Sequence, residues 1–199
     1  MQNLYSQGYI EVVCGPMFAG KTEELIRRIK RYEYANKEVV VFKPIIDNRY
    51  SALGEIVSHN LSKKPSILIN KAEEIFSYIN DTTNVVVIDE AQFFDNDIID
   101  VCEELADRGL HVICGGLDRD FKGEPFGPIP FLLAKAEQVT KLTAICVKSG
   151  LPATRTQRMV DGKPANYNDP LIVIGAKEQY EPRARHCHEV PGKQRKYKN

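Results

Sequence analysis

The segment from Gly15 to Thr22, which reads GPMFAGKT, constrains the fold more than any other stretch of the chain. Its two glycines lie five positions apart, and a lysine and a hydroxyl residue follow directly. Glycine allows backbone N–H groups to turn inward around phosphate oxygens. The lysine can place an ammonium on the β- and γ-phosphates of a triphosphate, and the hydroxyl can bind Mg²⁺. The pattern therefore predicts a phosphate-binding loop, with Lys21 on the phosphates and Thr22 on the metal.

The segments on either side of this loop have the structure that such a loop requires. Tyr9 to Cys14 reads as a strand, Lys21 to Ala35 as an amphipathic helix, and Glu38 to Phe42 as a second apolar strand. A strand, a helix and a strand in this order imply a right-handed crossover and a parallel sheet. A chance match of a short motif is the alternative, and this context argues against it. We expect an α/β fold, a P-loop NTPase-like parallel sheet flanked by helices.

A second candidate functional segment is Val85 to Asp89, which reads VVVID, an apolar strand that ends in a carboxylate. In a phosphate-loop protein, a carboxylate at this strand end holds Mg²⁺ through its waters, although Asp89 could also only cap the strand. Glu90 is then well placed to take a proton from an attacking hydroxyl or water. One of the next aromatics, Phe93 or Phe94, could stack on a flat substrate, or both could lie in the core.

Two loops add candidate residues. Residues 43–54 carry Asp47 and Arg49, and this loop is either plain surface or an overhang above the phosphate site, at the sheet edge where open α/β sheets bind ligands. Residues 117–131 form a longer loop with three prolines and three phenylalanines. So many phenylalanines argue against disorder, and we therefore expect a functional loop.

The pattern of predicted secondary structure changes after residue 143. Thr154 to Val160 and Leu171 to Gly175 read as strands, and Asp161-Gly162 is a good two-residue hairpin turn. We expect residues 1–143 to form an ATP-binding α/β domain and residues 144–190 a small β domain. The basic tail then spans residues 191–199.

Composition excludes several classes of function. Lysine plus arginine and aspartate plus glutamate both number 27, so bulk charge gives no sign of a nucleic-acid partner. No apolar run is long enough to span a membrane, no signal-peptide pattern begins the chain, and five cysteines are not spaced like a disulfide framework. We expect a soluble, cytoplasmic protein. The basic run at residues 27–31 and His111 at a strand start both read as ordinary surface features.

Several separate stretches then resemble one family, the type II or cytosolic-type thymidine kinases. They are GPMFAGKTEEL, IIDNRYS, VIDEAQFF, LDRDFKGEPFGPIP, TRTQRMVDGKPA and VIGAKEQYEPR, and they run in order from about Tyr9 to Pro191. The resemblance implies transfer of the ATP γ-phosphate to the 5′-hydroxyl of thymidine, which gives dTMP for DNA synthesis. It also implies a C-terminal, zinc-ribbon-like lasso domain that closes over the nucleoside, a homotetramer, and feedback inhibition by dTTP.

The resemblance also assigns roles to individual residues. Glu90 matches the general base, and Lys21, Asp47 and Arg49 complete the catalytic group. The ATP contacts that it implies are Gly15, Pro16, Met17, Phe18, Ala19, Gly20, Lys21, Thr22, Asp89, Glu90, Ala91 and Gln92. The nucleoside contacts that it implies are Met17, Phe93, Leu117, Phe121, Phe126, Thr156, Leu171, Ile172, Val173, Ile174, Gly175 and Tyr180. Mg²⁺ would be held by Thr22 and Asp89.

One departure from the family concerns zinc. The family's small domain is commonly a zinc ribbon with two Cys-x-x-Cys pairs, but here Ser149 and Ala184 stand in two of the four ligand positions. Cys146 and Cys187 are then the remnants of the site. We expect zinc binding to be weak or lost, with His186 or His188 as the alternative that could rescue it.

Two rival functions fit parts of the sequence. A motor-type P-loop ATPase would use the same carboxylates to activate water in place of a nucleoside hydroxyl, and its ATP turnover would need no added nucleoside. A non-enzymatic nucleic-acid binder could be built on the degenerate ribbon and the basic tail, but net neutrality weighs against it.

Overall fold

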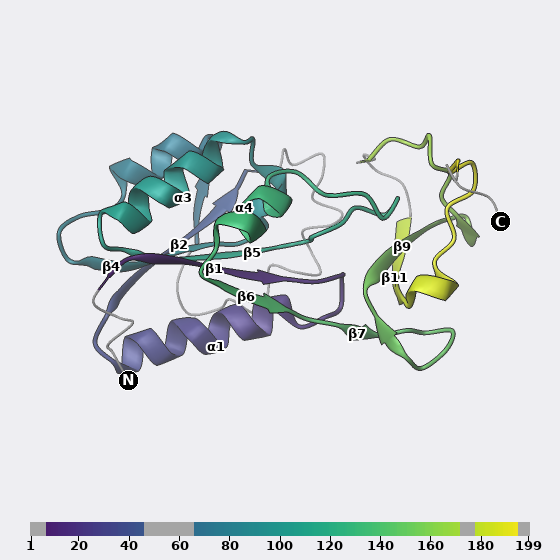
Figure 1. Cartoon of the computed structure of the whole chain (residues 1–199), viewed down its shortest axis with the longest axis horizontal. Coiled ribbons are helices and arrows are strands. Elements are labelled where there is room, and N and C mark those ends of the chain that lie inside the picture. Colours follow the sequence, from purple (N-terminus) through teal and green to yellow (C-terminus); the bar gives the residue numbers. More distant parts are fainter. Residues whose placement is uncertain (1–6, 46–65, 172–177, 195–199) are drawn as a thin grey trace.

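The central element of the computed structural model, which describes residues 7–45, 66–171 and 178–194, is a six-stranded sheet (Figure 1). Its strands run in the order β3-β2-β4-β5-β1-β6, and every neighbouring pair is parallel. The strands are β1 (Tyr9–Cys14), β2 (Glu38–Pro44), β3 (Ile67–Ile69), β4 (Thr83–Ile88), β5 (His111–Gly116) and β6 (Gln138–Lys141). The predicted α/β architecture with a parallel sheet is confirmed.

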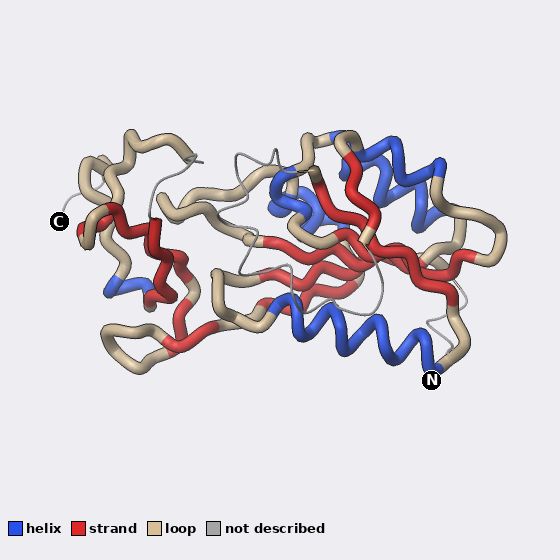
Figure 2. Tube along the Cα trace, turned by 180° about the vertical axis from the view of Figure 1, so that it is seen from behind, coloured by secondary structure: helices blue, strands red, loops and turns tan. Residues whose placement is uncertain are grey.

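Helices cover both faces of this sheet. Helix α1 (Lys21–Tyr34) lies on one face, and η3 (Ala72–Ser77), α3 (Asp97–Asp107) and α4 (Ile129–Lys135) lie on the other (Figures 1 and 2). Among the helices of the described residues, none has the length and hydropathy that crossing a membrane requires.

The two apolar cores follow from the alternation of side chains along the strands. Val85 and Val87 of β4 pack with Leu25 and Ile29 of α1, whereas Val86 and Ile88 face the opposite core. Because successive strand residues point to opposite faces, a strand buried on both faces is a continuous apolar run. This explains why β4 reads VVVI without polar alternation.

Strand β5 continues through Gly115 and Gly116, although adjacent glycines are depleted in strands and commonly mark a turn. Both residues pair with the last two residues of β1. A Cβ at Gly115 would lie 2.6 Å from Leu25 Cδ1, and one at Gly116 would lie 2.6 Å from Gln92 Oε1. The glycines are therefore needed because neighbouring side chains fill the space, and they do not break the strand.

The C-terminal part forms two small antiparallel sheets beside the main one (Figure 2). One joins β7 (Ala144–Ile145) to β8 (Pro152–Ala153), and the other has the order β10-β9-β11, with β9 (Arg155–Val160), β10 (Lys163–Pro164) and β11 (Glu178–Arg183). A single turn, η5 (Arg185–Cys187), follows β11.

The predicted hairpin turn is confirmed: Asp161 and Gly162 have φ angles of 47° and 74°, as a two-residue turn with positive φ at both positions requires. Strand β11, which pairs along the whole of β9, was not predicted. Of the predicted strand Leu171 to Gly175, residues 172–175 lie outside the described residues.

Candidate active site

The phosphate-binding loop joins the end of β1 to the start of α1, as the sequence predicted. Gly15 is buried with φ 151°, and a Cβ there would lie 2.6 Å from the Leu142 carbonyl oxygen. Gly20 has φ 81° and is the N-cap of α1. Both glycines are therefore required, the first for space and the second for its left-handed backbone. The loop thus presents its N–H groups at a helix N-terminus, where anions bind.

Lys21, the first residue of α1, lies among carboxylates at this edge of the sheet. Its Nζ donates to the Pro16 carbonyl oxygen at 2.9 Å, across the loop. Burial lowers the pKa of the Lys21 ammonium, while the charges of Glu90, Asp89 and Asp118 act in the opposite direction. The structure therefore brings the loop lysine and the two carboxylates that follow β4 into one electrostatic cluster.

Asp89 directly follows β4 and is only 3% exposed. One of its oxygens pairs with Lys43 Nζ at 3.0 Å, and the other accepts the backbone N–H of Glu90 at 3.0 Å. Thr22 is half-buried in the first turn of α1. Carboxylate and hydroxyl oxygens are the donors that Mg²⁺ prefers, so the side chains at this edge fit the ion.

Glu90 has a conformation and a surrounding that suit a proton acceptor. Its φ of 55° is unusual for a residue other than glycine, and Gln92 Nε2 donates to its Oε2 at 2.5 Å. Burial raises the pKa of the Glu90 carboxyl and so does the charge of Asp89, whereas Lys21, Gln92 and Lys43 lower it; the net direction is upward. A carboxylate with a raised pKa is a stronger base.

Gln92 connects this carboxylate to the long loop after β5. While its Nε2 donates to Glu90, its Oε1 accepts the backbone N–H of Leu117 at 3.0 Å. The side chain is 3% exposed. Both ends of a buried amide are therefore fixed, and this holds Glu90 in one orientation.

Aromatic side chains gather beside this cluster. The rings of Phe93 and Phe126 meet edge to face with centroids 5.5 Å apart, and Phe121 is buried with the Arg158 guanidinium 4.9 Å from its ring centroid. Phe94 is buried in the core, whereas Phe93 is half-buried, so of the two only Phe93 has a surface that a flat ligand could meet.

The C-terminal sheets contact the phosphate-binding loop and the long loop directly. Thr156 Oγ1 in β9 accepts the backbone N–H of Met17 at 3.0 Å. His188 Nε2 lies 2.9 Å from the Phe121 carbonyl oxygen, and Lys193 pairs with Glu124 at 2.6 Å. The small β part therefore lies against the two loops that carry candidate ligand contacts.

Some predicted site residues lie outside the described residues, namely Asp47, Arg49, Ile172, Val173, Ile174 and Gly175. Of the predicted lasso, Leu171 is 37% exposed and Tyr180 is half-buried in β11, opposite Arg158 of β9.

A charged cluster that the sequence analysis did not find lies two residues past the end of β5. Asp118, 5% exposed, pairs through Oδ2 with Lys141 Nζ at 2.7 Å and Arg119 Nη1 at 3.1 Å. The charge of Asp118 also acts on Lys21. A usable signal was present, because polar residues just after a parallel strand lie at the ligand-binding edge of the sheet.

The four positions that correspond to a zinc ribbon do not form a ligand set. Cys146 and Ala184 are buried in one small cluster, against which Cys187 packs. Within the described residues there is no group of three or more histidine, cysteine, aspartate or glutamate side chains arranged to hold a metal. His188, one of the two possible substitutes, instead contacts the Phe121 carbonyl. The donor set does not fit a four-ligand structural zinc.

Cys146 has an environment that stabilises a thiolate. Burial raises the pKa of this thiol, but hydrogen bonds from the Ser149 side chain and from the backbone of Ala184, Lys148 and Ser149 together lower it to about 6.

The chain is similar to proteins that are already known. A model of the thymidine kinase family matches residues 8–188. The flagellar accessory protein FlaH from Methanocaldococcus jannaschii has a crystal structure with a TM-score of 0.47 and 11% identity, over 80% of this chain and 76% of that chain. A structural likeness at that level carries no argument about fold or function, whereas the family match spans most of the sequence. The chain therefore belongs to the thymidine kinase family, the kinases that phosphorylate thymidine.

Proposed function

We propose that this protein transfers the γ-phosphate of ATP to the 5′-hydroxyl of thymidine and so forms dTMP. The observation that carries the proposal is Glu90, a half-buried base with a raised pKa, in one electrostatic cluster with the phosphate-loop Lys21. Both lie at the carboxyl edge of the parallel sheet, where α/β proteins of this type bind ligands.

The phosphate-binding loop supplies positioning and charge. Phosphoryl transfer needs little covalent help from a protein, so alignment and charge neutralisation dominate its catalysis. Backbone N–H groups of residues 15–20 would bind phosphate oxygens, and Lys21 Nζ would exchange the Pro16 carbonyl for the β- and γ-phosphates. Thr22 and Asp89 would hold Mg²⁺, which neutralises charge on the transferred group when it is bound.

Glu90 would accept the proton of the 5′-hydroxyl as the new P–O bond forms. The charge of Lys21 favours the ionised carboxylate, while burial keeps its basicity high. Gln92 would hold the carboxylate in place through its 2.5 Å bond. The resemblance also assigns Ala91 and Gln92 to the ATP contacts.

The nucleoside would lie between the long loop and the small β part. Phe93 and Phe126 offer aromatic faces and edges for the thymine ring, with Leu117 and Phe121 around them. Thr156 and Met17 join the two parts at this place. Residues 171–175 and Tyr180 would close over the base, and Asp47 and Arg49 would approach the 5′-hydroxyl and the phosphates; these roles rest on the resemblance.

Further properties belong to the proposal on the same basis. They are assembly as a homotetramer, feedback inhibition by dTTP, and action in the cytoplasm in thymidine salvage for DNA synthesis.

A coupled assay of ADP release tests the proposal. Thymidine should raise ADP formation far above the rate with ATP and Mg²⁺ alone, and purine nucleosides should not. Equal ADP release with and without any nucleoside would contradict the proposal and would make water the acceptor, as in a P-loop ATPase.

A further inference from the structure

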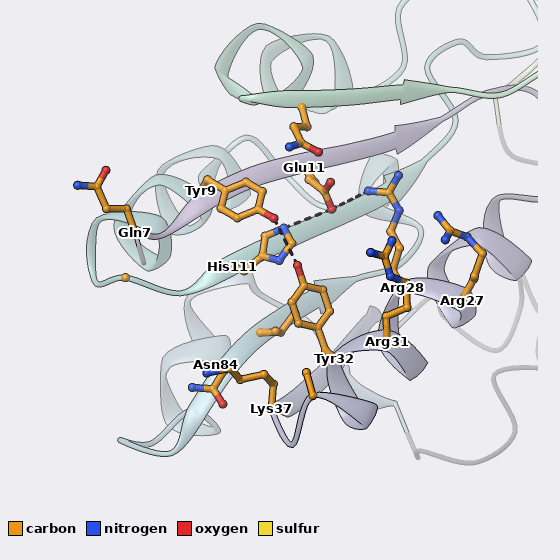
Figure 3. A pocket seen from close by; sticks show the side chains of 14 residues that line it. Gln7, Tyr9, Glu11, Arg27, Arg28, Arg31, Tyr32, Lys37, Asn84 and His111 are labelled. Atoms are coloured by element: carbon orange, nitrogen blue, oxygen red, sulfur yellow. Dashed lines mark hydrogen bonds and ion pairs between the residues drawn. The ribbon is translucent and has the colours of Figure 1, made fainter. Parts of the chain in front are cut away.

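A cavity, drawn in Figure 3, is lined by residues at the start of β1 and β5, the end of the sheet opposite to the phosphate-binding loop. Its floor includes Tyr9 and His111, the first residues of β1 and β5, whereas the phosphate loop follows the last residue of β1. At about 3.3 Å per strand residue, β1 separates the two places by roughly 17 Å. The cavity volume of about 460 Å³ lies within the range of small-molecule sites.

Helix α1 contributes a wall of arginines to this cavity. Arg27 pairs with Glu24 at 2.6 Å, and Arg28 pairs with Glu24 at 2.8 Å and with Glu11 at 2.6 Å. Figure 3 shows these guanidinium groups along one side of the cavity, with Glu11 beside the guanidinium of Arg28. The basic run at residues 27–31, which the sequence indicated to be a solvated helix face, therefore lines part of the cavity wall.

Two more cations line the same cavity. Arg31 of α1 and Lys37, which precedes β2, belong to its wall, and no ion pair joins either of them to another residue of the described part of the chain. The wall thus carries four cations, two of which pair with the carboxylates of Glu11 and Glu24, and the difference is two positive charges. An excess of this size matches a dianion, and a phosphate monoester carries close to two negative charges at neutral pH.

His111 adds a buried polar ring at the end of the cavity. The sequence suggested a surface residue, but His111 is 6% exposed, because Tyr9 stacks on its ring at 3.8 Å and Tyr32 meets its ring edge at 5.0 Å. Nε2 lies 3.3 Å from Glu11 Oε2, and neither ring nitrogen has a hydrogen-bond partner within the described residues. A buried polar atom without a partner is costly unless a ligand or water meets it.

We propose that this cavity, which we call the α1 pocket, binds a small phosphate monoester. Arg31 and Lys37 would contact the phosphate oxygens, since a planar guanidinium matches their geometry and an ammonium adds a point charge, and His111 would lie at the inner end. The site uses none of the residues assigned to phosphoryl transfer, so it stands or fails independently of the proposed function.

Histidine NMR tests the proposal at the site itself. The chain has four histidines, so protein labelled with ¹³C at histidine Cε1 gives few signals, and His111→Gln identifies the one from the pocket. Titration with glycerol 2-phosphate at pH 7.5 should shift the His111 signal saturably. Sodium chloride at matched ionic strength should not. No shift, or an equal shift in chloride, would overturn the proposal.

Variants separate this pocket from the phosphate-binding loop. Arg31→Gln combined with Lys37→Gln should weaken the binding seen at His111 by about tenfold or more, because two charge-assisted contacts are lost. Lys30→Gln, on the same helix but outside the cavity wall, should change it by less than about twofold. The titration should persist in Lys21→Ala. If it disappears there, or if the double variant binds as the parent does, the ligand is bound elsewhere and the proposal is wrong.

Discussion

Replacing Glu90 by glutamine removes the proposed base and keeps its size. The hydrogen bond from Gln92 Nε2, 2.5 Å in the parent, can persist because the new amide oxygen also accepts. We expect the rate of thymidine phosphorylation to fall by about 10²–10⁴, the usual contribution of a general base. This corresponds to a rise in the activation barrier of roughly 3–5 kcal/mol. ATP binding should stay close to that of the parent.

The pH dependence of the parent gives a second test of the same residue. Only ionised Glu90 can accept a proton, and burial raises the pKa of this carboxyl above its usual range. kcat/KM for thymidine should therefore rise with pH through that raised pKa and then level off. The Glu90→Gln enzyme should lack this ascending limb.

The free energy of unfolding should fall as pH rises, whereas activity should rise. Because the pKa of Glu90 is higher in the folded chain than in the unfolded chain, the folded state binds more protons between the two values. Ionised Glu90 therefore lowers the free energy of unfolding as pH rises through this window. Above it, Glu90→Gln should unfold at a higher urea concentration than the parent, and below the unfolded-state pKa this difference should vanish.

The matched control is Glu104→Gln, which removes a carboxylate that is half exposed on α3. It should leave kcat and the pH profile unchanged. A Glu90→Gln enzyme within about twofold of the parent rate, or one that keeps the ascending limb, would refute the role of Glu90 and make Asp47 the leading candidate for the base.

Four further changes test separate parts of the account. Lys21→Ala should raise the Kd of ATP, measured by calorimetry, and lower kcat by about 10²-fold or more, since its ammonium meets oxygens that gain charge in the transition state; intact values would remove the loop from the ATP site. Asp118→Asn should lower kcat/KM for ATP by about tenfold in steady-state kinetics, because Lys141 and Arg119 lose their shared carboxylate; an unchanged value would make that ion cluster irrelevant to catalysis. Thr156→Val should lower the free energy of unfolding in urea by about 1–3 kcal/mol, because the Met17 N–H loses its acceptor. The parent should carry clearly less than one zinc per chain by elemental analysis, whereas Ser149→Cys with Ala184→Cys should raise zinc content and melting temperature together; one tightly held zinc in the parent would contradict this.

The parts of the fold that sequence reasoning predicted are those fixed by local pattern. The phosphate loop, the strand before it and the helix after it follow from glycine placement and apolar periodicity within about 25 residues. The hairpin at Asp161-Gly162 is equally local, because positive φ at two adjacent positions is a property of those residues.

Features that depend on distant packing could not be predicted in this way. Gly115 and Gly116 look like a strand end until Leu25 and Gln92 occupy the space that side chains would need. His111 looks exposed until α1 places Tyr32 across it. Strand β11 carries charges and a proline, and it becomes a strand because β9 offers it six paired positions.

The same distinction, between local pattern and distant packing, applies to the candidate site. Lys21, Asp89 and Glu90 were predicted, because each stands in a short motif whose chemistry requires it. Asp118 and Lys141 were missed, since their contact joins the ends of β5 and β6, which follow one another in sequence but do not pair with each other in the sheet. Such a pair emerges only from strand order, which places β1 between β5 and β6.

The identity of the acceptor atom tests the central claim most directly. The protein should be incubated with ATP, Mg²⁺ and thymidine, and the products followed by ³¹P NMR with proton coupling retained. We predict a new phosphomonoester signal that is split by the two 5′-methylene protons of thymidine and grows in step with ADP. A signal of inorganic phosphate alone, growing with ADP while thymidine stays unchanged, would contradict the account.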